Sequence, residues 1–384
     1  MPYYDKEILS GFSTYKYNSI DNSPLSVYVM HPFWNWCVTF CPSWVAPNLL
    51  TFTGFLMVIA NMLLLCYFDW NFTSSKLGPD IPVWVWWICY FLHTTAHTLD
   101  GIDGKQARIT KSSTPLGELF DHGVDSLSTV FMPMGIFSAV GRVPGDGSEF
   151  TMHYLAWTIL ITFALSHVEK YNTGVLFLSW GYDAGLLFIG FLYIGTGCFG
   201  PRIWDGPFFG LSFNTIVQTV MVSMAVLVSI PMYIYAILSG YAKGTLKHGL
   251  LKGAMPIVST LLLFALCTYW AYFSPNKILS IEPRVFIFMQ GVLFSNHVCR
   301  IIIAQMTSSD APFLNPLLFP LAVIIVCVCN LTPILFYERF LLIGFTIFAS
   351  LVHLHFGVCV VREIAEFLNI YVFSITSKPL KRGL

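Results

Sequence analysis

Four aspartates in one short stretch of the chain are the residues best suited to carry out chemistry. The spacing is three positions in the pair Asp100 and Asp103, and four positions in the pair Asp121 and Asp125. Either spacing places both side chains on one face of a helix. Apolar runs flank the stretch, which predicts that one membrane helix ends near the first pair and the next begins near the second. The two pairs should then meet at one end of a helical hairpin, joined by a turn that holds Gly104, Lys105, Arg108 and Gly117.

Acids held at a membrane without compensation usually mark a functional site, and divalent metal is the natural compensation. Carboxylate oxygens suit hard cations, so the cluster predicts a site for magnesium, manganese or calcium. Two such ions can hold a pyrophosphate and stabilise an in-line displacement at phosphorus. Lys105 and Arg108 can neutralise phosphate charge. Glycines would let backbone and phosphate approach closely, at positions 101, 104, 117 and 123.

His122 follows Asp121 directly and is a candidate general base for deprotonating a hydroxyl group. An unperturbed imidazole titrates near pH ~6.5, which suits proton transfer at neutral pH. Asp125 is the alternative base. Glu118 lies one helical turn before His122, where it can orient the imidazole or bind an amino group of a nucleotide.

Two other interpretations of the acids are less consistent with the sequence. A structural network of ion pairs with Lys105, Arg108 and Lys111 does not require so many acids on two facing helices. A cation channel or transporter would tend to place its ion site near the middle of the bilayer, often at broken helices. The expected position at one edge, with a basic turn between the pairs, favours an anionic substrate held through metal.

The composition indicates the elements that position these residues. The chain is 56% hydrophobic and only 10% charged, and its apolar stretches of about 20 residues are long enough to cross a bilayer. The sequence therefore predicts an all-α polytopic membrane protein. With a net charge near zero, nothing indicates nucleic acid as a partner. About ten spans are expected, near residues 48–68, 82–100, 119–140, 152–168, 176–198, 214–238, 255–273, 285–305, 313–334 and 340–360.

Residues 1–47 are rich in aromatic side chains and are interrupted by prolines, which predicts short helices in the membrane interface. The expected organisation is this segment, a membrane domain over residues 48–362 with its motif at 100–125, and a tail over 363–384. An even number of spans places both termini and the acid cluster on the side that holds most Lys and Arg. That side is predicted to be the cytosol.

The spacing of these residues resembles the signature of the class I CDP-alcohol phosphotransferase family, D-x-x-D-G-x-x-A-R, eight residues, then G-x-x-x-D-x-x-x-D. The signature is matched at every fixed position, by Asp100, Asp103, Gly104, Ala107, Arg108, Gly117, Asp121 and Asp125. The longer run GKQARITKSSTPLGELFDHGVDSLSTVF is similar to the eukaryotic choline and ethanolamine phosphotransferases. The stretches YKYNSIDNSPLSVYVMHPFWN, APNLLTFTG, EKYNTG and WGYD extend the likeness to the ethanolamine branch over nearly the whole chain.

The resemblance implies a reaction. A CDP-alcohol donates its phosphoalcohol to the hydroxyl group of a lipid and releases CMP. In the ethanolamine branch, CDP-ethanolamine and diacylglycerol, or its ether-linked relative, give phosphatidylethanolamine in the final step of the CDP-ethanolamine (Kennedy) pathway. CDP-choline is the alternative donor, alone or together with CDP-ethanolamine, because an aromatic cage for choline cannot be read from composition.

The resemblance also implies roles for single residues. Asp100, Asp103, Asp121 and Asp125 would bind two Mg²⁺ ions, for which Mn²⁺ can substitute, and His122 would be the base. Contacts with the CDP-alcohol would come from Asn48, Gly104, Arg108, Gly117 and Glu118. Relatives are homodimers with ten helices, and the same is expected here. The expected location is the membrane of the endoplasmic reticulum, the Golgi or both, with the active site facing the cytosol.

Overall fold

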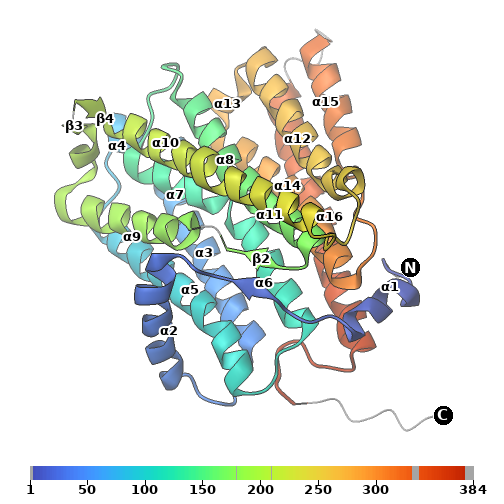
Figure 1. Cartoon of the computed structure of the whole chain (residues 1–384). Helices are drawn as coiled ribbons and strands as arrows, with labels where there is room; N and C mark the ends of the chain where they lie inside the picture. Colours follow the sequence, from blue (N-terminus) through green and yellow to red (C-terminus); the bar gives the residue numbers. More distant parts are fainter. Residues whose placement is uncertain (1–2, 179, 209, 331–336, 377–384) are drawn as a thin grey trace.

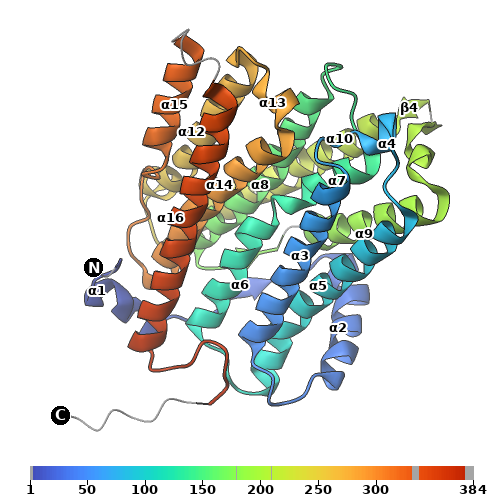
Figure 2. The same cartoon turned by 180° about the vertical axis from the view of Figure 1, so that it is seen from behind.

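The chain is built almost entirely of helices that pack side by side (Figures 1 and 2). The computed structural model describes residues 3–178, 180–208, 210–330 and 337–376. The helices that form the bundle are α3 (Pro47–Phe68), α5 (Val83–Ile109), α6 (Pro115–Ser128), α7 (Phe131–Val140), α8 (Ser148–Thr173), α9 (Gly181–Phe199), α10 (Phe213–Met224), α11 (Ile230–Ala242), α12 (Leu250–Phe273), α14 (Pro283–Thr307), α15 (Leu318–Asn330) and α16 (Glu338–Phe367).

Shorter elements connect or cover these helices. They are α1 (Lys6–Ser10), α2 (His31–Cys37), α4 (Ser74–Leu77) and α13 (Ile278–Ile281), with 3₁₀ turns at Gly11–Ser13, Val38–Phe40 and Pro201–Asp205 and π-helical turns at Ser26–Met30 and Ala225–Ser229. Two-residue strands form two small sheets. Strand β1 (Ser19–Ile20) pairs in parallel with β2 (Leu176–Phe177), and β3 (Pro207–Phe208) pairs antiparallel with β4 (Leu211–Ser212).

The prediction of an all-α polytopic membrane protein is confirmed. In the described part of the chain, seven helical stretches are long and apolar enough to cross a membrane, at residues 47–68, 115–140, 181–199, 213–242, 250–273, 283–307 and 338–367. Helices α5 and α8 have 27 and 26 residues and run in the same bundle, but polar side chains lower their hydropathy. The number of ten spans stays a prediction. The ninth predicted span, 313–334, lies partly outside the described residues.

The turn between the acid pairs is shorter than predicted. Helix α5 does not end near Asp100 but continues to Ile109, so Gly104, Lys105 and Arg108 are helical, and Gly117 lies within α6. Good helix formers at positions 106–108 favour this continuation. Thr114 then caps α6, because its Oγ1 accepts a hydrogen bond from the backbone N–H of Gly117 at 3.1 Å.

The N-terminal segment packs against the bundle through an extended stretch as well as through short helices. It contains the short helices α1 and α2, with exposed aromatic side chains at Trp36 and Trp44. Its residues 15–26, here called the strap, cross in front of α6 beside β2 (Figure 1). Backbone hydrogen bonds of 3.0 Å hold the strap, from Leu176 to Asn18 and from residue 178 to residue 20.

Helix α14 forms the centre of the bundle and supports α6 from behind (Figure 2). Nearly all of its side chains are buried, and its apolar side chains join one core with those of α8, α12 and α16. Ser126 of α6 and Ser295 of α14 are hydrogen-bonded at 2.6 Å. At Gly291 the helix lies so close to Val130 that a β-carbon there would be 2.5 Å from the Val130 side chain.

This close approach predicts that Gly291→Ala destabilises the protein by about 1–3 kcal/mol, because the added methyl group overpacks a filled interior. Gly344→Ala on α16 is the matched control, since a β-carbon there would meet nothing within 4 Å. It should be neutral or stabilise by about 0.5–1 kcal/mol, because alanine favours a helix. Thermal unfolding of both variants in detergent measures the difference. Equal effects of the two substitutions would contradict the packing described for α14.

Candidate active site

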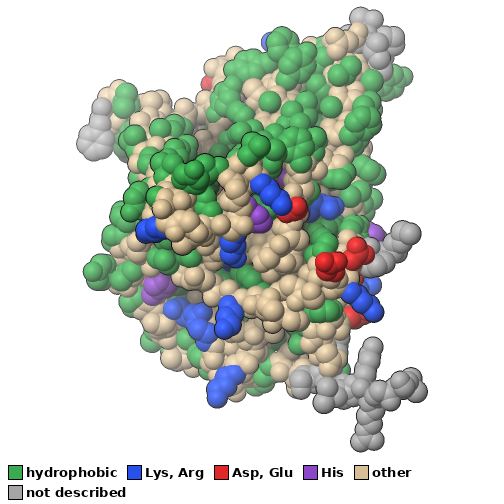
Figure 3. Space-filling model, turned by 45° about the vertical axis from the view of Figure 1, so that its right-hand side comes forward, with side chains coloured by type: hydrophobic (Ala, Val, Ile, Leu, Met, Phe, Trp, Pro, Cys, Tyr) green, Lys and Arg blue, Asp and Glu red, His purple; other side chains and the backbone are tan. Residues whose placement is uncertain are grey.

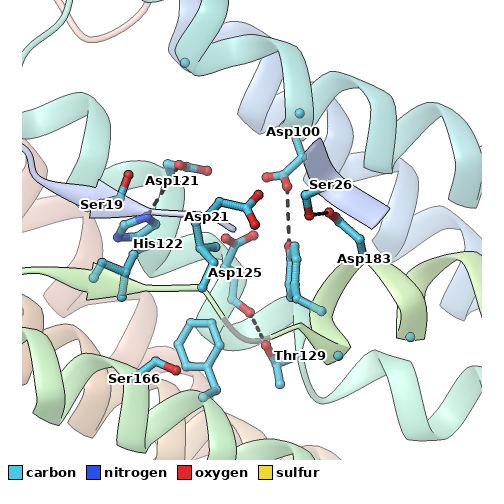
Figure 4. A pocket seen from close by; sticks show the side chains of 18 of the residues that line it. Ser19, Asp21, Ser26, Asp100, Asp121, His122, Asp125, Thr129, Ser166 and Asp183 are labelled. Carbon is cyan, nitrogen blue, oxygen red and sulfur yellow. Dashed lines mark hydrogen bonds and ion pairs between the residues drawn. The ribbon is translucent and has the colours of Figure 1, made fainter. Parts of the chain in front are cut away.

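Helices α5 and α6 bring the predicted acids together. Asp100, Asp103 and Asp121 each have a carboxylate oxygen within 4.8 Å of the others. Asp125 lies one turn after Asp121 and lines the same cavity, which has a volume of about 1000 Å³ (Figure 4). Sequence spacing therefore identified three acids that converge in space and a fourth on the same wall.

Neighbouring groups hold two of these carboxylates in place. Thr51 of α3 donates a hydrogen bond through Oγ1 to Asp103 Oδ2. Tyr182 of α9 donates through its hydroxyl group to Asp100 Oδ2 at 3.3 Å. Oδ1 of Asp121 is buried and has no hydrogen-bond partner among the described residues. Converging acids with an unpaired buried oxygen fit a hard divalent cation, which prefers oxygen ligands.

Glu118 takes part in a buried ion pair next to the acids. Lys170 of α8 is fully buried and donates to Glu118 Oε1, and Tyr15 of the strap donates to the same oxygen at 2.7 Å. Burial and the nearby Glu118 carboxylate raise the pKa of the Tyr15 phenol, so it stays protonated as a donor. Burial likewise raises the pKa of Tyr17 to about 12.

His122 lies in the cavity between Glu118 and Asp121. Its Nδ1 is 3.9 Å from Glu118 Oε1, and its Nε2 is 3.9 Å from Asp121 Oδ2. Its ring centroid is 5.3 Å from that of His167 on α8. Nδ1 has no hydrogen-bond partner in the described part of the chain. The imidazole is thus placed beside the acids with a nitrogen free to take part in proton transfer.

The other residues expected to contact a CDP-alcohol line the same cavity. Asn48, at the start of α3, lies against α6, with its Oδ1 3.3 Å from the position of a β-carbon on Gly117. Arg108 is exposed, and its Nη1 is 3.7 Å from the corresponding position on Gly104. Gly117 thus leaves room for the Asn48 side chain, whereas a β-carbon at Gly104 would make only an ordinary van der Waals contact with Arg108.

Two residues with an expected phosphate role have other contacts in this structure. Lys105 lines the cavity, and its Nζ donates to Asn35 Oδ1 at 2.8 Å. Gly101 accommodates the indole ring of Trp34, because a β-carbon at Gly101 would lie 2.1 Å from that ring. Close approach of a phosphate is therefore not what requires glycine at position 101.

A second buried polar cluster borders the cavity opposite α6. Asp183 of α9 accepts a hydrogen bond from Ser26 at 2.5 Å, and its other oxygen is 3.2 Å from His97 Nε2. His93 bonds to the carbonyl oxygen of Leu186 at 2.7 Å and belongs to the bundle interior. Sequence spacing placed His97 one turn before Asp100 but had no signal for its partner 86 residues away.

The cavity continues from the acids into an apolar region that the sequence did not identify. Side chains from α7, α9 and α10 line it, among them Ile136, Phe188, Val217, Val220, Met221 and Met224. The stretch that contains α10 and α11 has a hydropathy of 2.1, and none of its most apolar window is buried inside the protein. An exposed apolar helical stretch therefore forms one wall of a cavity that also contains the acids.

Comparison with known proteins agrees with this site. A profile of the family described as CDP-alcohol phosphatidyltransferase matches residues 44–282. Ethanolaminephosphotransferase 1 of Mus musculus is 46% identical over 376 residues, covering 97% of this chain and 94% of that protein. The Homo sapiens protein of the same name is 45% identical with the same coverage. Choline/ethanolaminephosphotransferase 1 of Arabidopsis thaliana is 31% identical over 399 residues, covering 98% of this chain and 100% of that protein.

The chain belongs to the CDP-alcohol phosphatidyltransferase family, which is the phosphotransferase family that the aspartate motif predicted. It is an integral membrane transferase of phospholipid biosynthesis. Enzymes of this family use divalent metal ions, in agreement with the converging acids of α5 and α6.

The ion pair of Lys170 and Glu118 gives a prediction about stability. Lys170→Met would leave the Glu118 carboxylate buried without its counter-charge and should destabilise the protein by about 3–5 kcal/mol. Adding Glu118→Gln removes that charge and should recover much of the loss. Lys243→Met, at an exposed position, is the control and should change stability by less than about 0.5 kcal/mol. Thermal unfolding in detergent tests this, and a double variant no more stable than Lys170→Met would contradict it.

Proposed function

We propose that the protein transfers phosphoethanolamine from CDP-ethanolamine to diacylglycerol or its ether-linked relative, giving phosphatidylethanolamine and CMP. One observation carries this proposal: a single cavity joins a cluster of converging acids to an apolar region walled by an exposed apolar helix. The reaction needs both parts, because the donor is a water-soluble nucleotide and the acceptor is a lipid. The names of the mammalian relatives support ethanolamine as the alcohol.

The acids of α5 and α6 would hold the diphosphate of the donor through two Mg²⁺ ions, with Mn²⁺ as a substitute. When bound, such ions neutralise phosphate charge and stabilise the negative charge that develops during displacement. Asp100, Asp103, Asp121 and Asp125 are the proposed ligands. Arg108 and Asn48 lie on the same cavity, where they would contact the CDP portion.

His122 is the proposed general base. The lipid hydroxyl oxygen attacks the phosphorus that carries ethanolamine, its proton passes to His122, and the bond from this phosphorus to the bridging oxygen breaks. CMP leaves with that oxygen. The free Nδ1 of His122 and its position next to Asp121 support this role. Asp125 is the alternative base, since it lines the same cavity.

The proposal includes ten spans, a homodimer, and an active site that faces the cytosol from the endoplasmic reticulum or Golgi. Tyr3 N–H donates to Glu363 at 2.7 Å, so the N-terminal segment and the end of α16 lie at the same end of the bundle. Figure 3 supports placing this end of the bundle at the cytosol. On the face that it shows, Lys and Arg gather in the middle and lower part, and hydrophobic side chains cover much of the upper part.

The central experiment uses purified protein in detergent with diacylglycerol and Mg²⁺, supplied with CDP-ethanolamine or CDP-choline in parallel. We expect CMP and phosphatidylethanolamine from CDP-ethanolamine. Asp121→Ala should abolish the activity, and His122→Gln should lower kcat by about 10²–10⁴, the usual contribution of a general base. Omitting the metal should also abolish transfer.

Other outcomes would identify the alternatives. Comparable transfer of phosphocholine would make the enzyme dual-specific, as the name of the Arabidopsis thaliana relative states for that protein. Full activity of His122→Gln would exclude His122 as the base and leave Asp125 as the candidate. Folded protein that releases no CMP with either donor would overturn the proposal and favour transport of a cation.

The apolar wall gives a separate prediction about the acceptor. Met221→Trp would fill part of the apolar region and should raise KM for diacylglycerol by about tenfold, the equivalent of a moderate steric cost. KM for CDP-ethanolamine should change by less than about twofold. Val222→Trp is the matched control, because Val222 is exposed on the same helix and does not line the cavity. If both substitutions act alike, or if Met221→Trp acts on the donor, the lipid does not use this wall.

A further inference from the structure

Seven carboxyl groups line the cavity, more than a metal site alone requires. Four are the proposed metal ligands of α5 and α6. Glu118 is paired with Lys170 and Tyr15, and Asp183 is held by Ser26 and His97. The remaining carboxyl group belongs to Asp21 on the strap, which the family signature does not include.

The surroundings of Asp21 differ from those of Glu118 and Asp183. Its side chain retains 16% exposure, and the imidazole of His31 contacts it, with Nε2 3.2 Å from Asp21 Oδ2. The His31 side chain is itself 37% exposed. The backbone N–H of Ser23 donates to Oδ1 at 3.3 Å. The Asp21 carboxylate therefore has lone pairs left for a cationic ligand.

The carboxyl group of Asp21 is directed into the cavity that would hold the substrate. Figure 4 shows its carboxyl group directed into the cavity, in the region bordered by Asp100 and Asp125. The rings of Trp34 and Tyr182 line the same cavity, and aromatic faces also attract cations. The Trp34 indole N–H is buried and has no hydrogen-bond partner in the described ranges.

We propose that Asp21 binds the primary ammonium group of the donor headgroup and thereby selects ethanolamine over choline. This inference rests on the proposed function. A primary ammonium has three N–H donors that a carboxylate can accept, whereas a trimethylated ammonium has none. With the diphosphate held by the acids of α5 and α6 and the CDP portion in contact with Asn48 and Arg108, the headgroup would meet the strap at Asp21.

The test measures transfer by Asp21→Asn, which keeps the shape of the side chain and removes its charge. We expect KM for CDP-ethanolamine to rise by about tenfold or more, because a charge-assisted hydrogen bond is lost. CDP-choline, measured as substrate or as competing inhibitor, should bind with less than about a threefold change. Inhibition by CDP, which lacks the headgroup, should not change. Asp21→Glu keeps the charge and should lie between wild type and Asp21→Asn.

Asp5→Asn is the matched control, since Asp5 is exposed on the same N-terminal segment and does not line the cavity. It should leave the constants for CDP-ethanolamine, CDP-choline and CDP unchanged. Thermal unfolding in detergent checks that each variant is folded. If Asp21→Asn does not fold, Asp21→Glu and Asp21→Ser are compared instead. The quantity compared is the change in KM for CDP-ethanolamine relative to the change for CDP-choline.

Two results would overturn the assignment. In one, Asp21→Asn weakens CDP-ethanolamine, CDP-choline and CDP equally, which would place Asp21 in the support of the strap or of the metal site. In the other, it changes none of them. Failure of the proposed function looks different, because wild-type protein would then transfer nothing from CDP-ethanolamine.

Discussion

Concentrated negative charge in a largely apolar bundle is the constraint on which the rest of this structure depends. Burying a carboxylate is costly unless a counter-charge or hydrogen bonds compensate it. The carboxylates on different walls of the cavity are compensated in different ways. Lys170 neutralises Glu118, and hydroxyl groups of Thr51 and Tyr182 bond to two of the acids. These contacts leave most of the charge on α5 and α6 uncompensated, and divalent metal with a diphosphate ligand would balance it.

Holding that charge in one place requires a rigid support. Helix α14 is buried along nearly its whole length and packs directly against α6, with no room for a side chain at Gly291. Helix α3 packs against both α5 and α6 and supplies Thr51 and Asn48 to the site. The outer helices α10 and α11 are instead apolar and largely exposed, and the π-helical turn between them at Ala225–Ser229 borders the apolar part of the cavity. Rigid elements thus hold the acids, while an exposed element would admit the acceptor.

Sequence reasoning found the residues whose chemistry depends on helical spacing and missed those that approach from elsewhere. Asp100, Asp103 and Asp121 converge as their intervals predicted, because helix geometry fixes which side chains share a face. The predicted end of α5 near Asp100 was wrong, since glycines suggested a turn where the helix continues to Ile109 through good helix formers. The strap gave no periodic signal, because strands of two residues have no alternation to detect. Its contacts with Glu118 and Asp183 depend on tertiary structure alone.

The active site must bind the CDP group and also discriminate between alcohols, and the strap would allow different elements to perform these two tasks. Every donor of this family carries the CDP group, so the α5–α6 acids can be the same whichever alcohol is transferred. Discrimination between alcohols has to come from another element, and Asp21 lies on one. Tyr15 joins the same strap to Glu118, which lies beside His122. One short segment would thereby connect the proposed headgroup contact at Asp21 with the surroundings of the proposed base, His122.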